Sequence, residues 1–198
     1  MKLLAFSDIH CDLDQAAELV ERSAEADVVI GAGDFGSVHK GIDETVAALG
    51  AVEKPSIIVP GNNETEEELR AAAASWPSAT VLHGSGTEVD GVAFYGLGAG
   101  IPTTPWNWSF DLDEAEAEAM LADCPEGGVL VVHSPPKGHA DRSGAGDHLG
   151  SEAILAAIER CHPRYAVCGH IHESWGERSK VGETEVINLG PGGTVLEL

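Results

Sequence analysis

Basic residues are scarce in this sequence. Its 198 residues include 11 Lys and Arg against 33 Asp and Glu, which gives a formal net charge of −22 at pH 7. Because no basic cluster is present, a stable complex with nucleic acid is not expected. The acidic residues are dispersed, as in 111–118, and such a surface repels itself unless salt screens it. We therefore expect a cytoplasm rich in salt, with an ordinary acidic soluble protein as the alternative.

Long hydrophobic runs and paired cysteines are also missing. No apolar run reaches roughly 18 residues and no basic segment precedes an apolar one, so neither a membrane span nor classical secretion is expected, and we predict a cytoplasmic protein. No C-x-x-C spacing occurs among Cys11, Cys124, Cys161 and Cys168. A structural zinc cluster or a dithiol site is therefore not expected, and the thiols should be reduced and mostly buried.

The pattern of apolar residues predicts one α/β domain covering residues 1–198. Its length suits a single domain, and 43% hydrophobic residues are typical of a globular protein. In the first part, continuous apolar strands alternate with helical patterns, which indicates a parallel sheet covered on both faces. The predicted strands are 2–6, 28–30 and 56–59, and the predicted helices are 12–26, 43–51 and 64–74.

The rhythm changes after residue 78. Short strands separated by glycine turns are predicted first, and a loop at 98–109 follows that holds Pro102, Pro105, Trp106 and Trp108. Further strands and helices alternate before an antiparallel tail at 175–198. The predicted strands are 79–82, 87–90, 92–97, 129–132 and 166–168, and the predicted helices are 111–122 and 151–161.

Five of the apolar strands end in side chains that can bind a metal ion. These side chains are Asp8, His10, Asp34, Asn62, His133, His170 and His172. In an open α/β sheet, ligands bind in the crevice outside the carboxyl ends of the strands. We therefore expect all seven side chains to meet at one end of one sheet and to form a single site.

The donor set indicates which metal the site would hold. Two carboxylates, four imidazoles and one amide oxygen exceed the coordination shell of one ion and suit two divalent transition metals, with Mn²⁺ favoured and Fe, Ni²⁺, Co²⁺ or Zn²⁺ as alternatives. Four histidines argue against Mg²⁺, which prefers oxygen. Two such ions need a bridging carboxylate and acidify a bridging water, so the set predicts in-line attack of a metal-bridging hydroxide on a phosphoester.

At this point the sequence resembles the calcineurin-like metallophosphoesterases. The motifs that carry the resemblance are D-x-H (Asp8, His10), G-D (Gly33-Asp34), G-N-x-E (Gly61 to Glu64), a strand-end His133 and G-H-x-H (Gly169 to His172). The resemblance implies two mixed β-sheets packed as a sandwich flanked by helices. It also implies that Asp8, His10 and His172 hold one metal, that Asn62, His133 and His170 hold the other, and that Asp34 bridges them.

Two longer stretches refine the resemblance. Residues 133–141 with 146–151, and the loop at 102–107, look like the small prokaryotic phosphoesterases related to cyclic-nucleotide phosphodiesterases. One position departs from the pattern, because much of the family has a histidine where this chain has Asn63. An amide can donate a hydrogen bond but cannot protonate a leaving group near pH 7. We predict that Asn63 orients a phosphate oxygen and that good or metal-assisted leaving groups are favoured.

Several further residues are candidates for substrate contact or support. His148 and His139 follow the predicted ligand His133 in the chain, and each is a candidate substitute acid or substrate contact. Trp106, with Trp108, could wall a pocket for a base or an aryl group. Glu173 and Asp141 are candidates for supporting the ligands. The remaining histidines, His39, His83 and His162, are expected at the surface or in structural hydrogen bonds.

The favoured function is therefore a phosphodiesterase with two metal ions, acting on a small phosphoester that is nucleotide-like. A phosphomonoesterase of the same family and a metal-binding scaffold without turnover are the alternatives. The absence of a basic groove argues against a nuclease. The chain is expected to be a monomer or a homodimer, without membrane partners.

Overall fold

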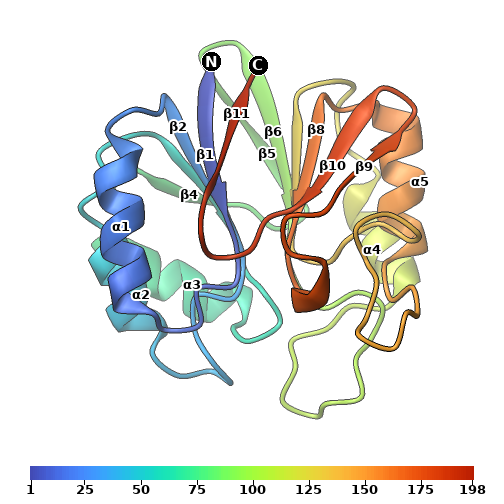
Figure 1. The fold of residues 1–198 in the computed structure, drawn as a ribbon, viewed down its shortest axis with the longest axis horizontal. Coiled ribbons are helices and arrows are strands. Elements are labelled where there is room, and N and C mark those ends of the chain that lie inside the picture. The colour runs from blue at the N-terminus through green and yellow to red at the C-terminus, as the bar shows by residue number, and fades with distance from the viewer.

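Two β-sheets lie face to face between two layers of helices in the computed structural model, which describes residues 1–198 (Figure 1). The five-stranded sheet has the order β11-β1-β2-β3-β4, and the six-stranded sheet has the order β5-β6-β7-β8-β10-β9. In the first sheet, β1 to β4 are parallel and β11 is antiparallel to β1. In the second, β6, β7, β8 and β10 are parallel, with β5 and β9 antiparallel at the edges.

The strands are short, as the sequence pattern predicts. The first sheet contains β1 (Lys2–Phe6), β2 (Val28–Ala32), β3 (Ser56–Val59), β4 (Ala79–Val81) and β11 (Thr194–Glu197). The second contains β5 (Ser85–Val89), β6 (Val92–Leu97), β7 (Val129–Val132), β8 (Tyr165–Cys168), β9 (Arg178–Val181) and β10 (Thr184–Asn188).

Five α-helices cover the outer faces of the sheets (Figure 1). The first sheet is covered by α1 (Leu13–Ser23), α2 (Ile42–Leu49) and α3 (Glu66–Ala72), and the second by α4 (Glu114–Leu121) and α5 (Glu152–Cys161). Short 3-10 turns occur at Ala73–Ser75 and His172–Ser174. Polar caps set several helix starts, because Asp12, Thr65, Asp113 and Ser151 each accept a backbone N–H of the first turn.

The alternation of side chains along the strands builds three apolar layers. In β1, Leu3 and Ala5 lie in the core between the sheets, whereas Leu4 and Phe6 pack against the helices of the first sheet. In β7, Val129 and Val131 face the same inter-sheet core, whereas Leu130 and Val132 pack under α4 and α5. Both faces of the central strands are therefore buried, which explains why their sequences are continuously apolar.

The expected fold class is confirmed, with one correction to the sheet arrangement. The strands that precede the seven polar side chains do not share one sheet: β1, β2 and β3 belong to the first, and β7 and β8 to the second. A strand buried on both faces has the same apolar pattern in either sheet, so the pattern alone cannot assign it. The strand expected at 87–90 instead spans Ser85–Val89. No helix of this structure combines the length and the hydropathy that crossing a membrane requires.

Candidate metal centre

The seven polar side chains meet where the carboxyl ends of the two sheets come together. Three of the preceding strands, β1, β2 and β3, belong to the first sheet, and β7 and β8 belong to the second. Five of them, His10, Asp34, Asn62, His170 and His172, line a cavity of about 550 Å³. The other two, Asp8 and His133, are buried and do not line it. The inter-sheet junction therefore gathers groups that lie up to 164 positions apart, from Asp8 to His172.

The backbone at this junction is unusual. Asp8, His10, Asp34 and His170 have φ values of 56°, 47°, 59° and 67°, all in the left-handed region that non-glycine residues rarely adopt. Such conformations cost free energy, and they cluster at functional sites where the surrounding structure enforces them. Four of the seven candidate ligands are therefore held in turns that aim their side chains at the junction.

One group of donors surrounds Asp8. The Oδ1 atom of Asp8 lies 3.6 Å from Nε2 of His172 and 4.0 Å from Nε2 of His10. The two imidazole Nε2 atoms are 3.2 Å apart. These three residues form a compact group whose ligand atoms can share one ion.

A second group surrounds Asn62. Its Oδ1 atom lies 3.2 Å from Nε2 of His133 and 3.1 Å from Nδ1 of His170. Asp34 stands between the two groups, because its Oδ2 is 3.5 Å from Nε2 of His10 and its Oδ1 is 3.5 Å from Nε2 of His133. One carboxylate thus offers one oxygen to each group, which is the arrangement that a bridging ligand needs.

The donor set fits two divalent transition metals. Ligand bonds of about 2.1 Å in tetrahedral or octahedral geometry place neighbouring donor atoms roughly 3.0–3.4 Å apart. Five of the seven separations described above lie between 3.1 and 3.5 Å. Imidazole, carboxylate and amide donors together suit borderline metals. The residues that would hold one ion are Asp8, His10 and His172, those that would hold the other are Asn62, His133 and His170, and Asp34 would contact both.

Hydrogen bonds behind the ligands fix which atom of each faces the centre. Nδ1 of His133 bonds to the carbonyl oxygen of Ala32 at 2.8 Å, and Nδ1 of His10 bonds to that of Gly36 at 3.1 Å. Each ring therefore carries its proton on Nδ1 and presents the lone pair of Nε2 to the centre. Asn62 donates from Nδ2 to Ser109, which turns Oδ1 inward.

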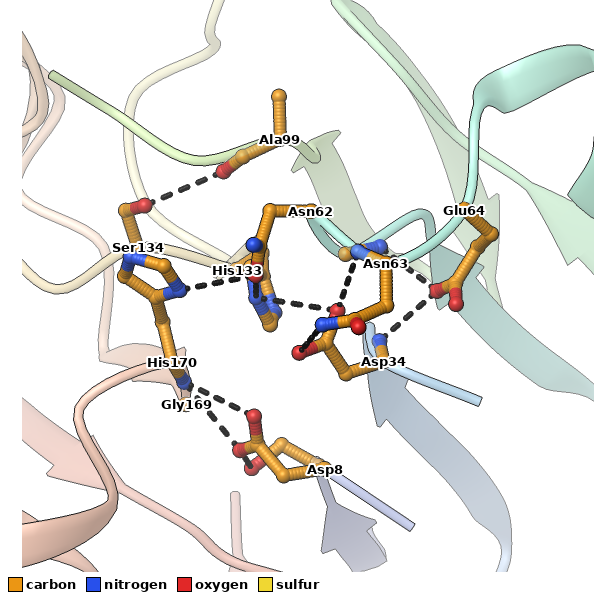
Figure 2. Close-up of polar contacts among 12 residues, drawn as sticks. Asp8, Asp34, Asn62, Asn63, Glu64, Ala99, His133, Ser134, Gly169 and His170 are labelled. Carbon is orange, nitrogen blue, oxygen red and sulfur yellow. Dashed lines mark hydrogen bonds and ion pairs between the residues drawn. The ribbon is translucent and has the colours of Figure 1, made fainter. Parts of the chain in front are cut away.

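Asp8 is buried among several hydrogen-bond donors. Ser7, the backbone N–H of His170 and the indole Nε1 of Trp175 all donate to its carboxylate. Figure 2 shows the contact from His170. Burial acts to raise the pKa of Asp8, but the contacts with His172, His133 and Ser7 outweigh burial and hold that pKa below its usual value. Asp8 is therefore kept ionised, which is the form that binds a cation.

Asn63 supports Asp34, as Figure 2 shows. Its backbone N–H donates to Oδ1 of Asp34 at 2.9 Å, and its Nδ2 donates to Oδ2 at 2.7 Å. The Oδ1 atom of Asn63 accepts the backbone N–H of Val38. Although Asn63 lines the cavity, its amide is already engaged on both atoms. Burial, followed by the nearby charge of Asp8, raises the pKa of Asp34 to about 7, and these bonds from Asn63 oppose that rise.

Glu64 organises the turns beneath this carboxylate. Its buried carboxylate accepts the backbone N–H groups of Asp34, Phe35, Gly36 and Gly61. Burial and the charge of Asp34 raise the pKa of Glu64 to about 7, against these hydrogen bonds. Because Glu64 ties the turn after β2 to the turn after β3, it sets the position of Asp34 relative to Asn62.

Two glycines of the motifs allow the backbone to approach the carboxylates. A Cβ atom on Gly61 would collide with the Asp34 carboxylate, and one on Gly169 would collide with that of Asp8. His170 follows Gly169 and is partly buried, and burial, with the neighbouring His133 as a further cause, lowers the pKa of His170 to about 3. A neutral imidazole is the form that can bind a metal.

The sequence also suggested residues for substrate contact and support, and only some of them line the cavity. Trp106, Trp108 and Glu173 line the cavity, whereas His148 and His139 do not. His139 bonds to Ser179 on β9 at 2.7 Å, and His148 bonds to the buried carboxylate of Asp141. Asp141 also accepts the N–H groups of Gly138 and Gly150, so it stabilises the loop after His133. The structure therefore separates the two loop histidines from the cavity.

Some supporting residues went unrecognised in the sequence. Asn188 ends β10, and its buried Nδ2 donates to the carbonyl oxygens of Ala140, Gly169 and Ile171, which fixes the turn of the G-H-x-H motif. The strand-end rule that marks the ligands marks Asn188 as well, because it follows the apolar pair Val186-Ile187. Trp175 packs against His172 with ring centroids 4.3 Å apart and ring planes inclined by 32°, and no sequence pattern indicated it.

Comparison with known proteins agrees with this geometry. The calcineurin-like phosphoesterase superfamily domain matches residues 1–196. MJ1162 of Methanocaldococcus jannaschii is 31% identical over 204 residues, which cover 96% of this chain and 88% of that protein. The two packed sheets, with a cluster of aspartates, histidines and an asparagine between them, are typical of a metal-dependent phosphoesterase. The chain belongs to the calcineurin-like phosphoesterase superfamily, whose members bind two divalent metal ions and are generally hydrolases.

Solved structures show the same fold at low sequence identity. The crystal structure of TT1561 of Thermus thermophilus has a TM-score of 0.77 at 18% identity and covers 96% of this chain and 90% of that chain. A structure described as a novel archaeal phosphodiesterase has a TM-score of 0.57 at 18% identity, covering 96% of this chain and 84% of that one.

Proposed function

We propose that this protein is a phosphodiesterase that hydrolyses a small phosphoester with two divalent transition metals, Mn²⁺ being favoured. The convergence of Asp8, His10, Asp34, Asn62, His133, His170 and His172 at one end of the cavity carries this proposal. When bound, two divalent ions neutralise the charge of a phosphoester and acidify water that can attack it. We place the protein in a cytoplasm rich in salt, as a monomer or a homodimer.

The protein's own residues prepare the site for that reaction. Asp8 and Asp34 are held by neighbouring donors, so the carboxylates need no reorganisation when cations bind. Nε2 of His10 and of His133 is turned inward by a bond on the opposite ring nitrogen. Trp106 and Trp108 border the space where the rest of the substrate would lie.

Two observations favour a diester over a monoester. Asn63 occupies the position of the usual histidine, and its amide, bonded to Asp34 and to the N–H of Val38, supplies no proton to a leaving group. No Lys or Arg lines the cavity, so nothing beyond the metal centre balances the second charge of a monoester dianion.

Hydrolysis of bis-p-nitrophenyl phosphate beside p-nitrophenyl phosphate tests the proposal. Metal-stripped protein is reloaded with Mn²⁺, Ni²⁺ or Zn²⁺ and assayed in low and in molar KCl. We expect metal-dependent cleavage of the diester, faster than that of the monoester, and its loss in His170→Ala.

The matched control is His162→Asn. His162 is an exposed residue at the end of α5 with a left-handed backbone that asparagine tolerates, so this variant should keep its activity. Faster cleavage of the monoester than of the diester would show that the protein is a phosphomonoesterase and not a phosphodiesterase. If neither ester is cleaved although two metals are measured in the protein, the protein is a metal-binding scaffold without turnover.

A further inference from the structure

One wall of the cavity is a stacked pair of indoles. Trp106 and Trp108 lie on the loop between β6 and α4, with ring centroids 5.6 Å apart and ring planes inclined by 12°. Half of the surface of Trp106 is exposed, although it lines the cavity. An exposed indole face at a cavity wall is a surface on which a flat aromatic group can stack.

The position of this wall is fixed relative to the metal centre. Asp111 accepts the N–H and the hydroxyl of Thr104 and the hydroxyl of Ser109, which closes the loop on itself. Ser109 in turn accepts from Nδ2 of Asn62, and the backbone N–H of Phe110 donates to the Asn62 carbonyl oxygen. A ligand held at the metal centre therefore meets the Trp106 indole at a set distance.

The charge around the cavity is unbalanced. Its 16 lining residues include no Lys and no Arg, and the one charged lining residue outside the candidate ligands is Glu173. The protein as a whole carries a formal net charge of −22. Only the metal centre offers positive charge, so a second anionic group on a ligand would face Glu173 and an acidic surface without compensation.

We propose that this cavity selects phosphodiesters that carry a single negative charge and a flat aromatic group stacked on Trp106, and that it rejects ligands with a second anionic group. This inference rests on the proposed function for the phosphate position. The remaining lining agrees with an uncharged, largely apolar group, because Pro102, Pro105, Leu149 and Ile171 contribute apolar surface. A volume of about 550 Å³ is within the range that holds a ligand of drug or nucleoside size.

The test measures binding without turnover. Phosphinates with two carbon substituents carry one negative charge on the phosphorus group and have only P–C bonds to those substituents, so the enzyme has no ester bond to cleave. Isothermal titration calorimetry on the Mn²⁺-loaded protein would compare four of them: dimethyl, phenyl(methyl), 4-carbamoylphenyl(methyl) and 4-carboxyphenyl(methyl) phosphinate. The last two have nearly the same shape and differ by one negative charge.

Two differences in binding affinity are expected among these ligands. The phenyl compound should bind roughly 5- to 100-fold more tightly than the dimethyl compound, the range for one ring stacked on an aromatic side chain. The carboxyphenyl compound should bind about tenfold more weakly than the carbamoylphenyl compound, because a second charge near Glu173 is repelled.

Variants assign each effect to its residue. Trp106→Ala should abolish the preference for the phenyl compound, whereas Trp106→Phe should retain most of it. Glu173→Gln should reduce the difference in affinity between the carboxyphenyl and carbamoylphenyl compounds. It should leave the preference for the phenyl over the dimethyl compound unchanged. The proposal is overturned if the phenyl and dimethyl compounds bind equally, if Trp106→Ala keeps the preference, or if the carboxyl compound binds as tightly as the carbamoyl compound.

Failure of this inference is separable from failure of the proposed function. If the phosphinates bind in the expected order while no diester is cleaved, the phosphodiesterase proposal fails and the selectivity stands. If diesters are cleaved but the phosphinates show no preference for an aromatic ring or a single charge, the selectivity fails alone.

Discussion

Asn63 is the residue at which this chain departs most from the family it resembles. In the structure its backbone N–H and its Nδ2 both hold Asp34, while its Oδ1 accepts the N–H of Val38. We infer that Asn63 positions the bridging carboxylate, which the sequence alone did not indicate. Orientation of a phosphate oxygen, the role predicted from the sequence, would fall to the one N–H of Nδ2 that Asp34 leaves free.

Replacing Asn63 tests this division of roles. An imidazole at this position could protonate a poor leaving group, so Asn63→His should raise kcat for alkyl phosphomonoesters by about 10²-fold, at the lower end of general acid catalysis. Asn63→Ala should give no such gain and should lower kcat/KM for the p-nitrophenyl diester, because Asp34 loses a hydrogen bond. Steady-state kinetics on both ester classes measures this. If Asn63→His leaves the activity on alkyl monoesters unchanged, the missing histidine does not limit their hydrolysis.

The strand-end loops are the elements that the sequence predicted best. Each candidate ligand follows an apolar strand, and the structure places all seven at one junction, although between two sheets and not at the end of one. The residues that contact the substrate were less predictable from the sequence. His148 and His139 follow the ligand His133 in the chain, but their rings bond to Asp141 and to Ser179 on β9, and neither residue lines the cavity. Proximity along the chain does not determine where a loop side chain points.

The turn that carries His39 links two elements of the cavity. Its Nδ1 lies 2.8 Å from the Glu68 carboxylate near the start of α3, and its Nε2 lies 2.6 Å from the carbonyl oxygen of Trp108. Both partners only accept hydrogen bonds, so both bonds form only when the ring carries two protons. The bonds to Glu68 and to the Trp108 carbonyl raise the pKa of His39 above its usual 6.5, and the charge of Glu64 acts in the same direction.

A pH dependence follows for this link. Because the pKa is raised in the folded state, the stabilisation is fully present below pH 6.5 and is lost as the pH rises through the higher folded value. His39→Asn, which tolerates the left-handed φ of 59°, should therefore destabilise the protein more at pH 5.5 than at pH 8.5. The difference should be roughly 0.2–1 kcal/mol, since His39 is partly exposed and solvent screens the pair. Urea unfolding at the two pH values would refute this if the loss were equal.

At the scale of the whole molecule, the sequence predicted the layers but not the membership of each strand. Strands such as Val28–Ala32 and Val129–Val132 are apolar throughout because both of their faces are buried, one against the helices and one against the other sheet. That pattern is the same in either sheet. Only the resemblance to a known family implied two sheets, and the pairing of β3 with β4 and of β6 with β5 and β7 settles where each sheet ends.

The acidic surface is the other property of the whole molecule. Four ion pairs join Lys or Arg to a carboxylate, so most of the 33 acidic residues have no cationic partner. Screening shortens the range of their repulsion from about 10 Å at 0.1 M salt to about 3 Å at 1 M. We expect the melting temperature to rise by several degrees between 0.1 and 2 M KCl.

A charge variant separates repulsion from other effects of salt. Glu118, Glu126 and Glu183 are exposed and make no ion pair, so changing all three to Gln moves the formal charge from −22 to −19 without removing a contact. The variant should melt higher at low salt and should depend less on KCl. Identical salt curves for the two proteins, measured by calorimetry, would assign the effect to the salt and not to the charge.

The metal centre that we propose holds two ions among seven side chains from the two sheets, with Asp34 between the ions. Anomalous diffraction from crystals of the Mn²⁺-loaded protein measures this directly. We expect two peaks roughly 3.5–4 Å apart, the usual spacing of such pairs, one beside Asp8, His10 and His172 and the other beside Asn62, His133 and His170. A single peak, or two peaks that Asp34 does not join, would contradict this arrangement of the metal centre.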